Sequence, residues 1–238
     1  MVSDLGRWSY GEIERPLLII IGAGEFAEIA FEYFSNDSPY KVVGFAVERD
    51  YISQTTLAGL PIVPYEEVET LFPPEQHSAF VAVTYTRLNR VRARLYRETK
   101  RKEYECATYV SSRAFIWPTV SIGENVFIFE NNVVQHGVRI GNNVVLWSGN
   151  HIGHRSEISD HCYLASHVVV SGYCKIRESS FLGVNATLAN NITIGQNCLI
   201  GAGALILKDA PANTVYQGSP SEASKVNSLR FFKIPNGE

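Results

Sequence analysis

Five of the six histidines in this 238-residue chain lie within one stretch, and histidine is the usual general base near neutral pH. They are His136, His151, His154, His161 and His167. His154 stands in the polar strip Asn150-His151-Ile152-Gly153-His154-Arg155, whose glycine lets a ligand approach the backbone. We expect His154 to be a catalytic base and Asn150 and His151 to contact substrate. A solvated corner residue is the alternative for His154, and the spacing leaves the role of His151 open.

His136 precedes His154 by eighteen residues, and each follows a large aliphatic residue by two positions. This shared position makes His136 a second catalytic candidate or a stacked neighbour of His154. His161 and His167 occupy a different position of the same pattern. We expect these two histidines at the surface or at an interface between copies of the chain.

A second group of candidate residues follows the apolar run from Leu17 to Ile21, in the segment Gly22-Ala23-Gly24-Glu25-Phe26-Ala27. A G-x-G-x-x-A segment between a strand and a helix makes a tight turn whose N–H groups bind polar ligands. Glu48 ends the next apolar run, where an acid can accept a hydrogen bond from a ribose hydroxyl. We expect a nucleotide-type ligand here, with a purely structural turn as the alternative. Because Glu25 opens the helix, we expect the nucleoside or sugar portion at this turn. The predicted contacts are Gly22, Ala23, Gly24, Glu25, Phe26 and Glu48.

A third candidate is the small-residue segment Gly201-Ala202-Gly203, followed by Lys208. Small outward-facing residues leave a smooth groove for an elongated ligand, and Lys208 is suited to meet a phosphate. Close packing between subunits explains the same residues equally well.

The elements that position these residues come from a six-residue repeat between Ile116 and about Pro211. Ile, Leu or Val occupies every sixth position sixteen times without interruption, and a small or apolar residue usually follows four positions later. A period of six fits neither a helix nor a single strand. It predicts a parallel β-helix of three-sided coils, in which residues eighteen apart stack at about 4.8 Å. Three cysteines fall on the small position, and we expect them to be buried, without disulfides or metal: Cys162, Cys174 and Cys198.

Residues 16–110 alternate short apolar runs with amphipathic segments, which is typical of a parallel α/β sheet. Strands are expected at residues 17–21, 41–47, 60–63, 79–84 and 104–109, and helices at 25–34, 66–71 and 87–102. This length suits half of a doubly wound dinucleotide fold. We therefore predict an α/β domain (1–112), a β-helix (113–212) and a C-terminal tail (213–238).

The β-helix should leave apolar side chains on its outside, with Val133, Val169 and Leu205 in one column and Trp147 on another. Short β-helices bury such columns against copies of themselves, so we expect a closed cyclic oligomer, a trimer. The tail ends in Arg230-Phe231-Phe232, which we expect to dock on a neighbouring surface.

Composition and charge narrow the class of partner. The chain is 45% hydrophobic and 19% charged with a net charge of −3, which argues against nucleic acid and anionic membranes as partners. Its longest apolar run is too short to span a bilayer, and its first sixteen residues do not form a signal peptide. We therefore expect a cytoplasmic protein.

Taken together, these residues resemble the hexapeptide-repeat acyltransferases. The narrower resemblance is to bacterial sugar acyltransferases with a small N-terminal nucleotide-sugar-binding domain. That group includes sialic acid O-acetyltransferases and the N-acetyltransferases of nucleotide-linked amino-deoxysugars. The resemblance rests on GAGEFAE, the uninterrupted hexads, GNHIGH, IGAGALILKD and YQGSPSE.

The resemblance implies a left-handed β-helix, a homotrimer and active sites between adjacent subunits. It implies acetyl-CoA along a groove, contacted by Gly172, Val184 and residues 201–203, with His154 deprotonating the acceptor. Two departures stand out: Arg155 replaces the acid that usually follows the catalytic histidine, and Tyr163 replaces a second histidine. Glu157 or a residue of a neighbouring chain is then expected to orient the imidazole of His154.

The function expected from residues and resemblance is acetyl transfer from acetyl-CoA to an amino group of a nucleotide-linked sugar, in surface polysaccharide or glycan biosynthesis. A backbone N–H near Gly172 is expected to stabilise the oxyanion. The alternatives are O-acetylation of a sugar hydroxyl, a non-catalytic trimeric binding module, and zinc-dependent hydration by histidines at a trimer interface.

Overall fold

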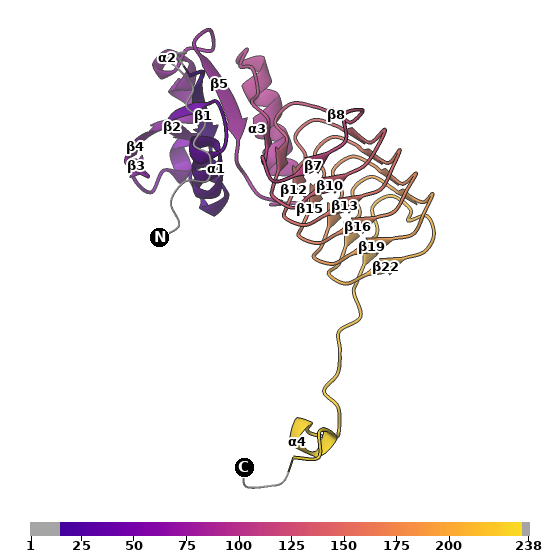
Figure 1. Cartoon of the computed structure of the whole chain (residues 1–238). Helices are drawn as coiled ribbons and strands as arrows, with labels where there is room; N and C mark the ends of the chain where they lie inside the picture. The colour runs from indigo at the N-terminus through magenta and orange to yellow at the C-terminus, as the bar shows by residue number, and fades with distance from the viewer. Residues whose placement is uncertain (1–14, 235–238) are drawn as a thin grey trace, which may run out of the picture.

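The computed structural model describes residues 15–234, which form an α/β unit, a β-helix and a C-terminal arm (Figure 1). The α/β unit contains a five-stranded sheet in the order β3-β4-β2-β1-β5. Neighbouring strands are parallel except at the edge, where the short β3 runs antiparallel to β4. The strands are β1 (Leu17–Ile21), β2 (Lys41–Val47), β3 (Thr56–Leu57), β4 (Leu60–Pro64) and β5 (His77–Val81).

Helices cover both faces of this sheet because its strands are apolar on both sides. α1 (Glu25–Asn36) packs with Leu18 and Ile20 on one face. α2 (Val68–Leu71) and α3 (Arg90–Arg101) pack with Ile19 and Ile21 on the other face, as the alternation of side chains along a strand requires. Two 3-10 turns follow β2 and β4, η1 (Arg49–Tyr51) and η2 (Tyr65–Glu67).

The predicted elements of this unit are present with ends shifted by a few residues, except the last. The strand predicted at residues 104–109 is wrong, because Cys106 makes a single bridge to Ala79 and the chain then leaves the sheet. Tyr109 finds its backbone partners in the β-helix instead, where its N–H donates to the carbonyl of Val126.

The repeat forms a parallel β-helix of two-residue strands, and the sixteen repeated Ile, Leu and Val residues end β7 to β22. The strands are β6 (Tyr109–Val110), β7 (Phe115–Ile116), β8 (Ser121–Ile122), β9 (Phe127–Ile128), β10 (Val133–Val134), β11 (Arg139–Ile140), β12 (Val145–Leu146), β13 (His151–Ile152), β14 (Glu157–Ile158), β15 (Tyr163–Leu164), β16 (Val169–Val170), β17 (Lys175–Ile176), β18 (Phe181–Leu182), β19 (Thr187–Leu188), β20 (Thr193–Ile194), β21 (Leu199–Ile200), β22 (Leu205–Ile206) and β23 (Val215–Tyr216). Residues eighteen apart are paired, as His151 is with Val133 and Val169. The predicted period, register and three-sided coil are thereby confirmed.

The three sides of the prism are named here by their first strands. The β6 face contains seven strands, the β7 face six and the β8 face five. The repeated aliphatic side chains and the small residues four positions later form one continuous core, which includes Cys162, Cys174 and Cys198. All four cysteines are buried and free, as predicted for the three in the repeat.

Three edges join these faces, and each is named by one residue. The His154 edge lies between the β7 and β8 faces, the Asn125 edge between the β8 and β6 faces, and the Gly201 edge between the β6 and β7 faces. One residue at most turns has a left-handed φ, and asparagine is the most frequent residue there, because asparagine tolerates this conformation better than most residues.

The α/β unit packs on the β-helix, mainly on its β6 face, through β5 at the edge of its sheet, where the ring centroids of Phe80 and Phe127 are 5.4 Å apart, and both α1 and α3 also contact the coils (Figure 1). An aromatic cluster fills the contact, in which Phe26 of α1 meets Phe127 at 5.5 Å and Phe129 stacks on Trp147 at 4.4 Å. The prediction that Trp147 lies in an exposed column is therefore wrong. Its ring is partly buried against the protein's own α/β unit, and its indole N–H donates to the hydroxyl of Tyr163.

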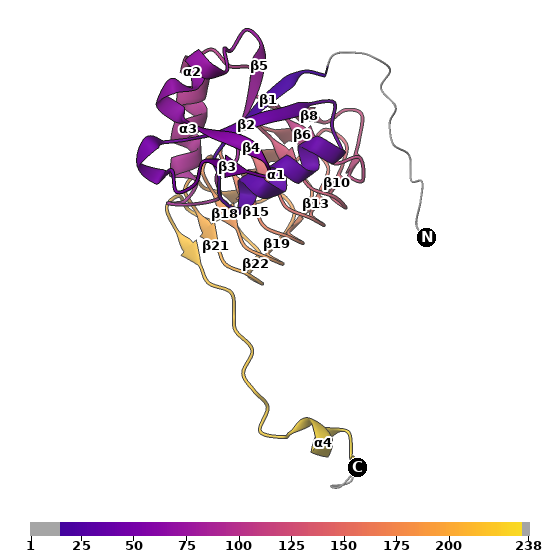
Figure 2. The same ribbon diagram turned by 90° about the vertical axis from the view of Figure 1, so that its left-hand side faces the viewer.

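After β23 the chain leaves the body as an extended arm, residues 217–234, which ends in the single-turn helix α4 (Ser228–Phe231) (Figure 2). Among residues 15–234, no helix combines the length and the apolar character needed to cross a membrane.

Candidate functional site

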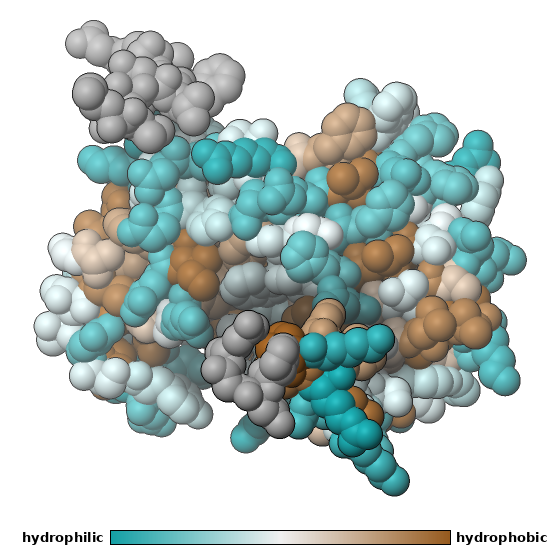
Figure 3. Space-filling view, turned by 60° about the horizontal axis from the view of Figure 1, so that its bottom comes forward, coloured by the Kyte–Doolittle hydropathy of each residue, from teal (hydrophilic) through white to brown (hydrophobic). Residues whose placement is uncertain are grey.

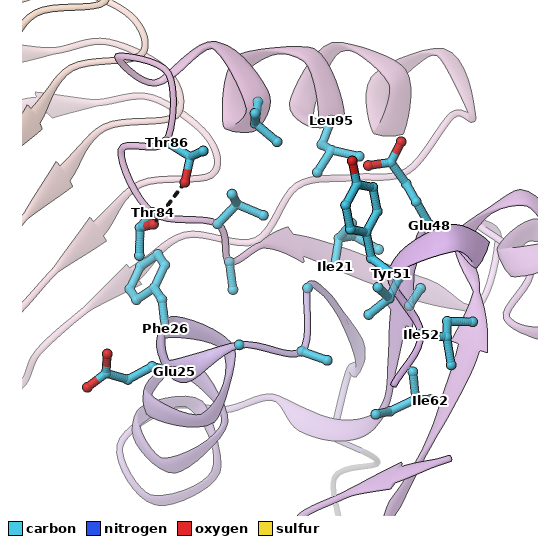
Figure 4. A pocket seen from close by; sticks show the side chains of 18 of the residues that line it. Ile21, Glu25, Phe26, Glu48, Tyr51, Ile52, Ile62, Thr84, Thr86 and Leu95 are labelled. Atoms are coloured by element: carbon cyan, nitrogen blue, oxygen red, sulfur yellow. Dashed lines mark hydrogen bonds between the residues drawn. The ribbon is translucent and has the colours of Figure 1, made fainter. Parts of the chain in front are cut away.

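A cavity of about 760 Å³ opens beyond the carboxyl ends of β1, β2 and β5 (Figure 4). The strand order reverses between β1 and β5, and open α/β sheets bind ligands at such a point. The residues predicted for a nucleotide-type ligand all line this cavity, namely Gly22, Ala23, Gly24, Glu25, Phe26 and Glu48. The structure thus brings together residues of two separate sequence segments.

The turn between β1 and α1 requires glycine at its first position. Gly22 has a φ of 128°, and a Cβ added there would lie 2.7 Å from the carbonyl oxygen of Ala82. Sterics do not explain the glycine at position 24, because a Cβ added to Gly24 would meet no heavy atom within 4 Å. Gly24 therefore leaves open space at the N-terminus of α1, where a polar ligand group can approach.

One wall of the cavity carries a pair of opposite charges that the sequence pattern did not predict. Arg94 of α3 donates to Glu48 at 2.9 Å and also pairs with Glu98 at 3.0 Å. The hydrogen bond with Glu48, together with its charge, raises the pKa of the Arg94 guanidinium. Glu48 is thereby held at the cavity with one carboxylate oxygen engaged, and a cation stands beside it.

Most of the other side chains that line the cavity are apolar or carry a hydroxyl group. In Figure 4, Glu48 and Tyr51 lie on one side, whereas Phe26, Thr84 and Thr86 lie on the side nearer the β-helix. Thr84 and Thr86 are within hydrogen-bond distance of each other, at 3.4 Å between their hydroxyl oxygens. This composition suits a ligand with an apolar ring and several polar substituents.

His154 is exposed on the His154 edge, and its ring lies against the next coil. A Cβ added to Gly172 would lie 2.5 Å from Cε1 of His154, so the imidazole occupies space that any other residue would fill. The ring also meets Tyr173 edge-on, with 5.0 Å between centroids. The ring of the predicted base is therefore positioned by the backbone of Gly172 and by the ring of Tyr173.

His136 lies on the same edge one coil earlier, but its ring turns the other way. Its Nδ1 is 2.9 Å from the hydroxyl of Thr119, which belongs to the preceding coil. The rings of His136 and His154 thus contact opposite neighbours, and the expected stacking of the two imidazoles is not what the structure shows.

The predicted partners of His154 have other roles in the structure. The N–H of Gly172, a candidate oxyanion donor, donates to Oδ1 of Asn190 at 3.0 Å. Glu157, a candidate for orienting the imidazole, lies on the β8 face and pairs with Arg139 at 3.1 Å. Both groups already have a partner within the same coil stack, which leaves the oxyanion donor and the orienting group to other residues.

The remaining predicted polar residues separate into buried and exposed positions. Asn150 is buried, and its side chain bonds the backbone of Trp147 and Val168, so it acts as a turn residue. His151 lies partly exposed on the β7 face. His167 is exposed as expected, whereas the expectation of an exposed or intersubunit His161 is wrong.

His161 is only 5% exposed because α3 covers it, and its ring meets Tyr96 at 5.7 Å. Burial lowers the pKa of His161 to about 4, and nearby arginines act in the same direction against the charge of Asp160. A histidine that stays neutral here serves the contact between the α/β unit and the β-helix.

The residues predicted to contact a second ligand lie on two different edges. Gly172 and Lys208 share the His154 edge, whereas Val184 and residues 201–203 lie on the Gly201 edge. The β7 face separates the two edges. Within one chain, therefore, these residues do not form a single groove.

The cavity and His154 also lie on opposite sides of the prism. The α/β unit covers the β6 face, and the His154 edge joins the other two faces. A ligand in the cavity thus cannot reach His154 of the same chain without passing around the β-helix. The cavity and His154 can come together only if the His154 edge of one copy approaches the α/β unit of another.

Sequence reasoning missed four residues of this region, Arg94, Thr84, Thr86 and Asn190. Arg94 and Asn190 act through contacts with other elements or coils, whereas Thr84 and Thr86 join the site because the loop after β5 lines the cavity. None of the four stands in a motif. The described part of the chain contains no group of three His, Cys, Asp or Glu side chains arranged to hold a metal ion.

Comparison with known proteins agrees with this architecture. The bacterial transferase hexapeptide family (six repeats) matches residues 119–154 and 173–208. A sequence comparison with curated proteins finds no match. The repeats described by this family model are thus present in two stretches of the β-helix.

Several solved structures share the fold over most of both chains. The acetyltransferase domain of PglB from Neisseria gonorrhoeae FA1090, in complex with acetyl coenzyme A, has a TM-score of 0.76 at 23% identity, and the match covers 88% of this chain and 99% of that one. PerB from Caulobacter crescentus, in complex with CoA and GDP-perosamine, has a TM-score of 0.75 at 23% identity, over 86% and 95% of the chains. WeeI from Acinetobacter baumannii AYE has a TM-score of 0.73 at 21% identity, over 87% and 98%. The fold is therefore an α/β unit followed by a left-handed parallel β-helix.

Proposed function

We propose that this protein transfers an acetyl group from acetyl-CoA to an amino group of a nucleotide-linked sugar, in surface polysaccharide or glycan biosynthesis. One observation carries the proposal: a nucleotide-type cavity and an uninterrupted hexapeptide β-helix occur in one chain. The same combination of folds is found in PerB, whose structure contains CoA and GDP-perosamine. The cytoplasm is the proposed location of this reaction.

The cavity supplies the acceptor site. Glu48 is placed to accept a hydrogen bond from a ribose hydroxyl, and Gly24 leaves room for polar groups at the start of α1. Glu25 lines the cavity near the β-helix and would face the amino sugar. A sugar attached to a nucleotide bound here would point out of the α/β unit toward a neighbouring copy.

His154 supplies the base. As the amine attacks the thioester carbonyl of acetyl-CoA, a tetrahedral intermediate forms, and His154 takes the proton that the nitrogen loses. The C–S bond then breaks, and the thiolate of CoA leaves and is protonated. His136 is too strongly turned toward Thr119 to share this step and is proposed to support the edge.

Acetyl-CoA is proposed to lie between two copies of a homotrimer. One copy would contribute Gly172 and Lys208 with His154, and the next copy Val184, Gly201, Ala202 and Gly203. This arrangement gathers both predicted sets of residues, which one chain holds on separate edges. It also brings the cavity of one subunit to the His154 edge of another.

The test is release of free thiol from acetyl-CoA against UDP-, dTDP- and GDP-linked amino sugars, with non-amino nucleotide sugars as controls. We expect turnover with an amino sugar, and His154→Asn should lower kcat by about 10²–10⁴-fold, the usual contribution of a general base. His77→Asn is the matched control, because His77 begins β5 and lies at the end of the sheet opposite the cavity.

Three outcomes would change the proposal. Turnover confined to the non-amino sugars would establish O-acetylation. Binding of acetyl-CoA without turnover on any acceptor would favour a binding module. Unchanged turnover in His154→Asn would remove this histidine from the mechanism.

A further inference from the structure

The C-terminal arm, residues 217–234, exposes several large hydrophobic side chains. Phe231 and Phe232 are each 71% exposed, and their rings contact each other at 5.2 Å. The large apolar side chains that the arm leaves in solvent are Val226, Leu229, Phe231, Phe232 and Ile234. Exposed apolar groups gathered on one segment indicate a surface that binds a partner.

The arm does not fold back on its own body. Figures 1 and 2 show it leaving the last coil and running away from both the β-helix and the α/β unit. Its direction is set at its root, because Gly218 packs on the backbone of Ala202, where an added Cβ would lie only 1.8 Å from the carbonyl oxygen. The helix α4 is nevertheless ordered locally, since the side chain of Asn227 caps it by accepting from the N–H of Arg230.

Charge distinguishes the arm from the rest of the chain. It carries three basic residues, Lys225, Arg230 and Lys233, and one acidic residue, Glu222. The arm therefore has a net charge of +2, whereas residues 15–216 have a net charge of −2. A basic, aromatic segment is electrostatically complementary to the weakly acidic body of another copy of the same chain.

The root of the arm lies beside a surface that also lacks a cover. The arm leaves from the Gly201 edge, which borders the β7 face. That face leaves Phe115 and Leu205 more than half exposed, and Val169 is partly exposed between them. Figure 3, in which the bottom of the molecule comes forward, shows hydrophobic patches interspersed among hydrophilic side chains. A copy that covers the β7 face would sit next to the root of the arm.

We propose that the arm reaches across to a second copy of this chain and docks Phe231 and Phe232 on that copy's body. Its residues span at most roughly 60 Å when extended, which is enough to cross a neighbouring β-helix. The arm would hold the oligomer together from the outside, while the β7 face packs inside. This inference does not depend on the reaction proposed above, because it concerns a segment remote from the cavity and from His154.

Photo-crosslinking tests the contact directly. Phe231 is replaced by p-benzoylphenylalanine in the full chain, and the purified protein is irradiated and separated by denaturing electrophoresis. We expect a covalent dimer whose crosslink maps, by mass spectrometry of mixed light and heavy chains, to residues 15–216 of the other copy. The matched control places the same probe at Leu71, which is 50% exposed on α2, and should give no dimer.

The energetic counterpart is the double variant Phe231→Ser/Phe232→Ser. Removing two aromatic anchors should raise the dissociation constant of the oligomer by roughly 100-fold in sedimentation equilibrium, whereas Leu71→Ser should leave it unchanged. Circular dichroism verifies that both variants remain folded. Crosslinks within one chain, crosslinks between arms alone, or an unchanged dissociation constant would overturn the proposal. Sedimentation with phosphatidylglycerol vesicles that depends on Phe231 and Phe232, without a covalent dimer, would also overturn it and assign the arm to a membrane surface.

Discussion

Acidification should destabilise this protein through His161, because the imidazole is fixed as a hydrogen-bond acceptor. The N–H of Val81 donates to Oδ1 of Asn125, and Nδ2 of Asn125 donates to Oδ1 of Asn143 at 2.8 Å. In turn, Nδ2 of Asn143 donates to Nδ1 of His161 at 2.8 Å. A backbone group at the end of β5 therefore orients the whole series, and a proton on Nδ1 would face another donor.

The magnitude follows from the two pKa values. His161 has a pKa of about 4 in the folded protein, chiefly because burial disfavours its charge, against about 6.5 in an unfolded chain. The folded state thus binds fewer protons between these values, and stability is full above pH 6.5 and falls as the pH drops toward 4. Between pH 7.5 and pH 5, the loss is about 2 kcal/mol.

Urea unfolding at pH 7.5 and pH 5, at one protein concentration, measures this loss. His161→Asn keeps an acceptor for Asn143 and places asparagine at a left-handed corner with a φ of 62°, so this variant should lose about 2 kcal/mol less than the natural protein. His167→Asn is the control, since it removes an exposed histidine at a similar corner and should change nothing. Equal losses in the natural protein and in His161→Asn would refute the reasoning.

Three further predictions concern packing and the cavity. Trp147→Ala should lower the free energy of unfolding by about 3–5 kcal/mol in urea titrations, because the indole fills the contact between the two units; a loss below about 1 kcal/mol would contradict that role. Gly22→Ala should abolish nucleotide-sugar binding in calorimetry, because a Cβ there clashes with Ala82, and wild-type affinity would show that the turn does not shape the site. Arg92→Met should cost less than about 1 kcal/mol or stabilise the protein, because the buried guanidinium leaves Nε and Nη1 without partners and makes one hydrogen bond, to the carbonyl of Cys162. A loss of about 3 kcal/mol on thermal or urea unfolding would mean that the ring of Tyr163, over which the guanidinium lies, compensates the buried charge.

The parts of the fold that depend on local sequence patterns were predictable, and those that depend on distant contacts were not. The period of six identified the inward side chains, because each coil repeats the same environment and its neighbours in space lie eighteen residues away. The turn at Gly22 was predictable for a similar reason, since the requirement for glycine arises within a short strand–turn–helix unit. The strand predicted at residues 104–109 failed because Tyr109 pairs with β9, a partner that no local pattern reveals.

The sequence predicted the positions of the candidate site residues along the fold, but it did not predict which neighbours their side chains contact. The spacing placed His136 and His154 on one edge, but the direction of each ring depends on contacts with Thr119 and Gly172 in different coils. From the sequence we also expected the N–H of Gly172 to be free to stabilise the oxyanion, whereas in the structure it donates to the side chain of Asn190.

By itself, the sequence determined which side chains fill the prism, where its corners lie and where the nucleotide-type turn sits, because all three are properties of short repeating or adjacent segments. The tertiary structure alone decided which outward faces are covered. It placed Trp147 and His161 beneath the α/β unit, the first partly buried and the second buried, through contacts with residues far away in the chain, such as Phe26 and Tyr96. It also put the cavity and the His154 edge on opposite sides of the β-helix, because the α/β unit packs on the β6 face.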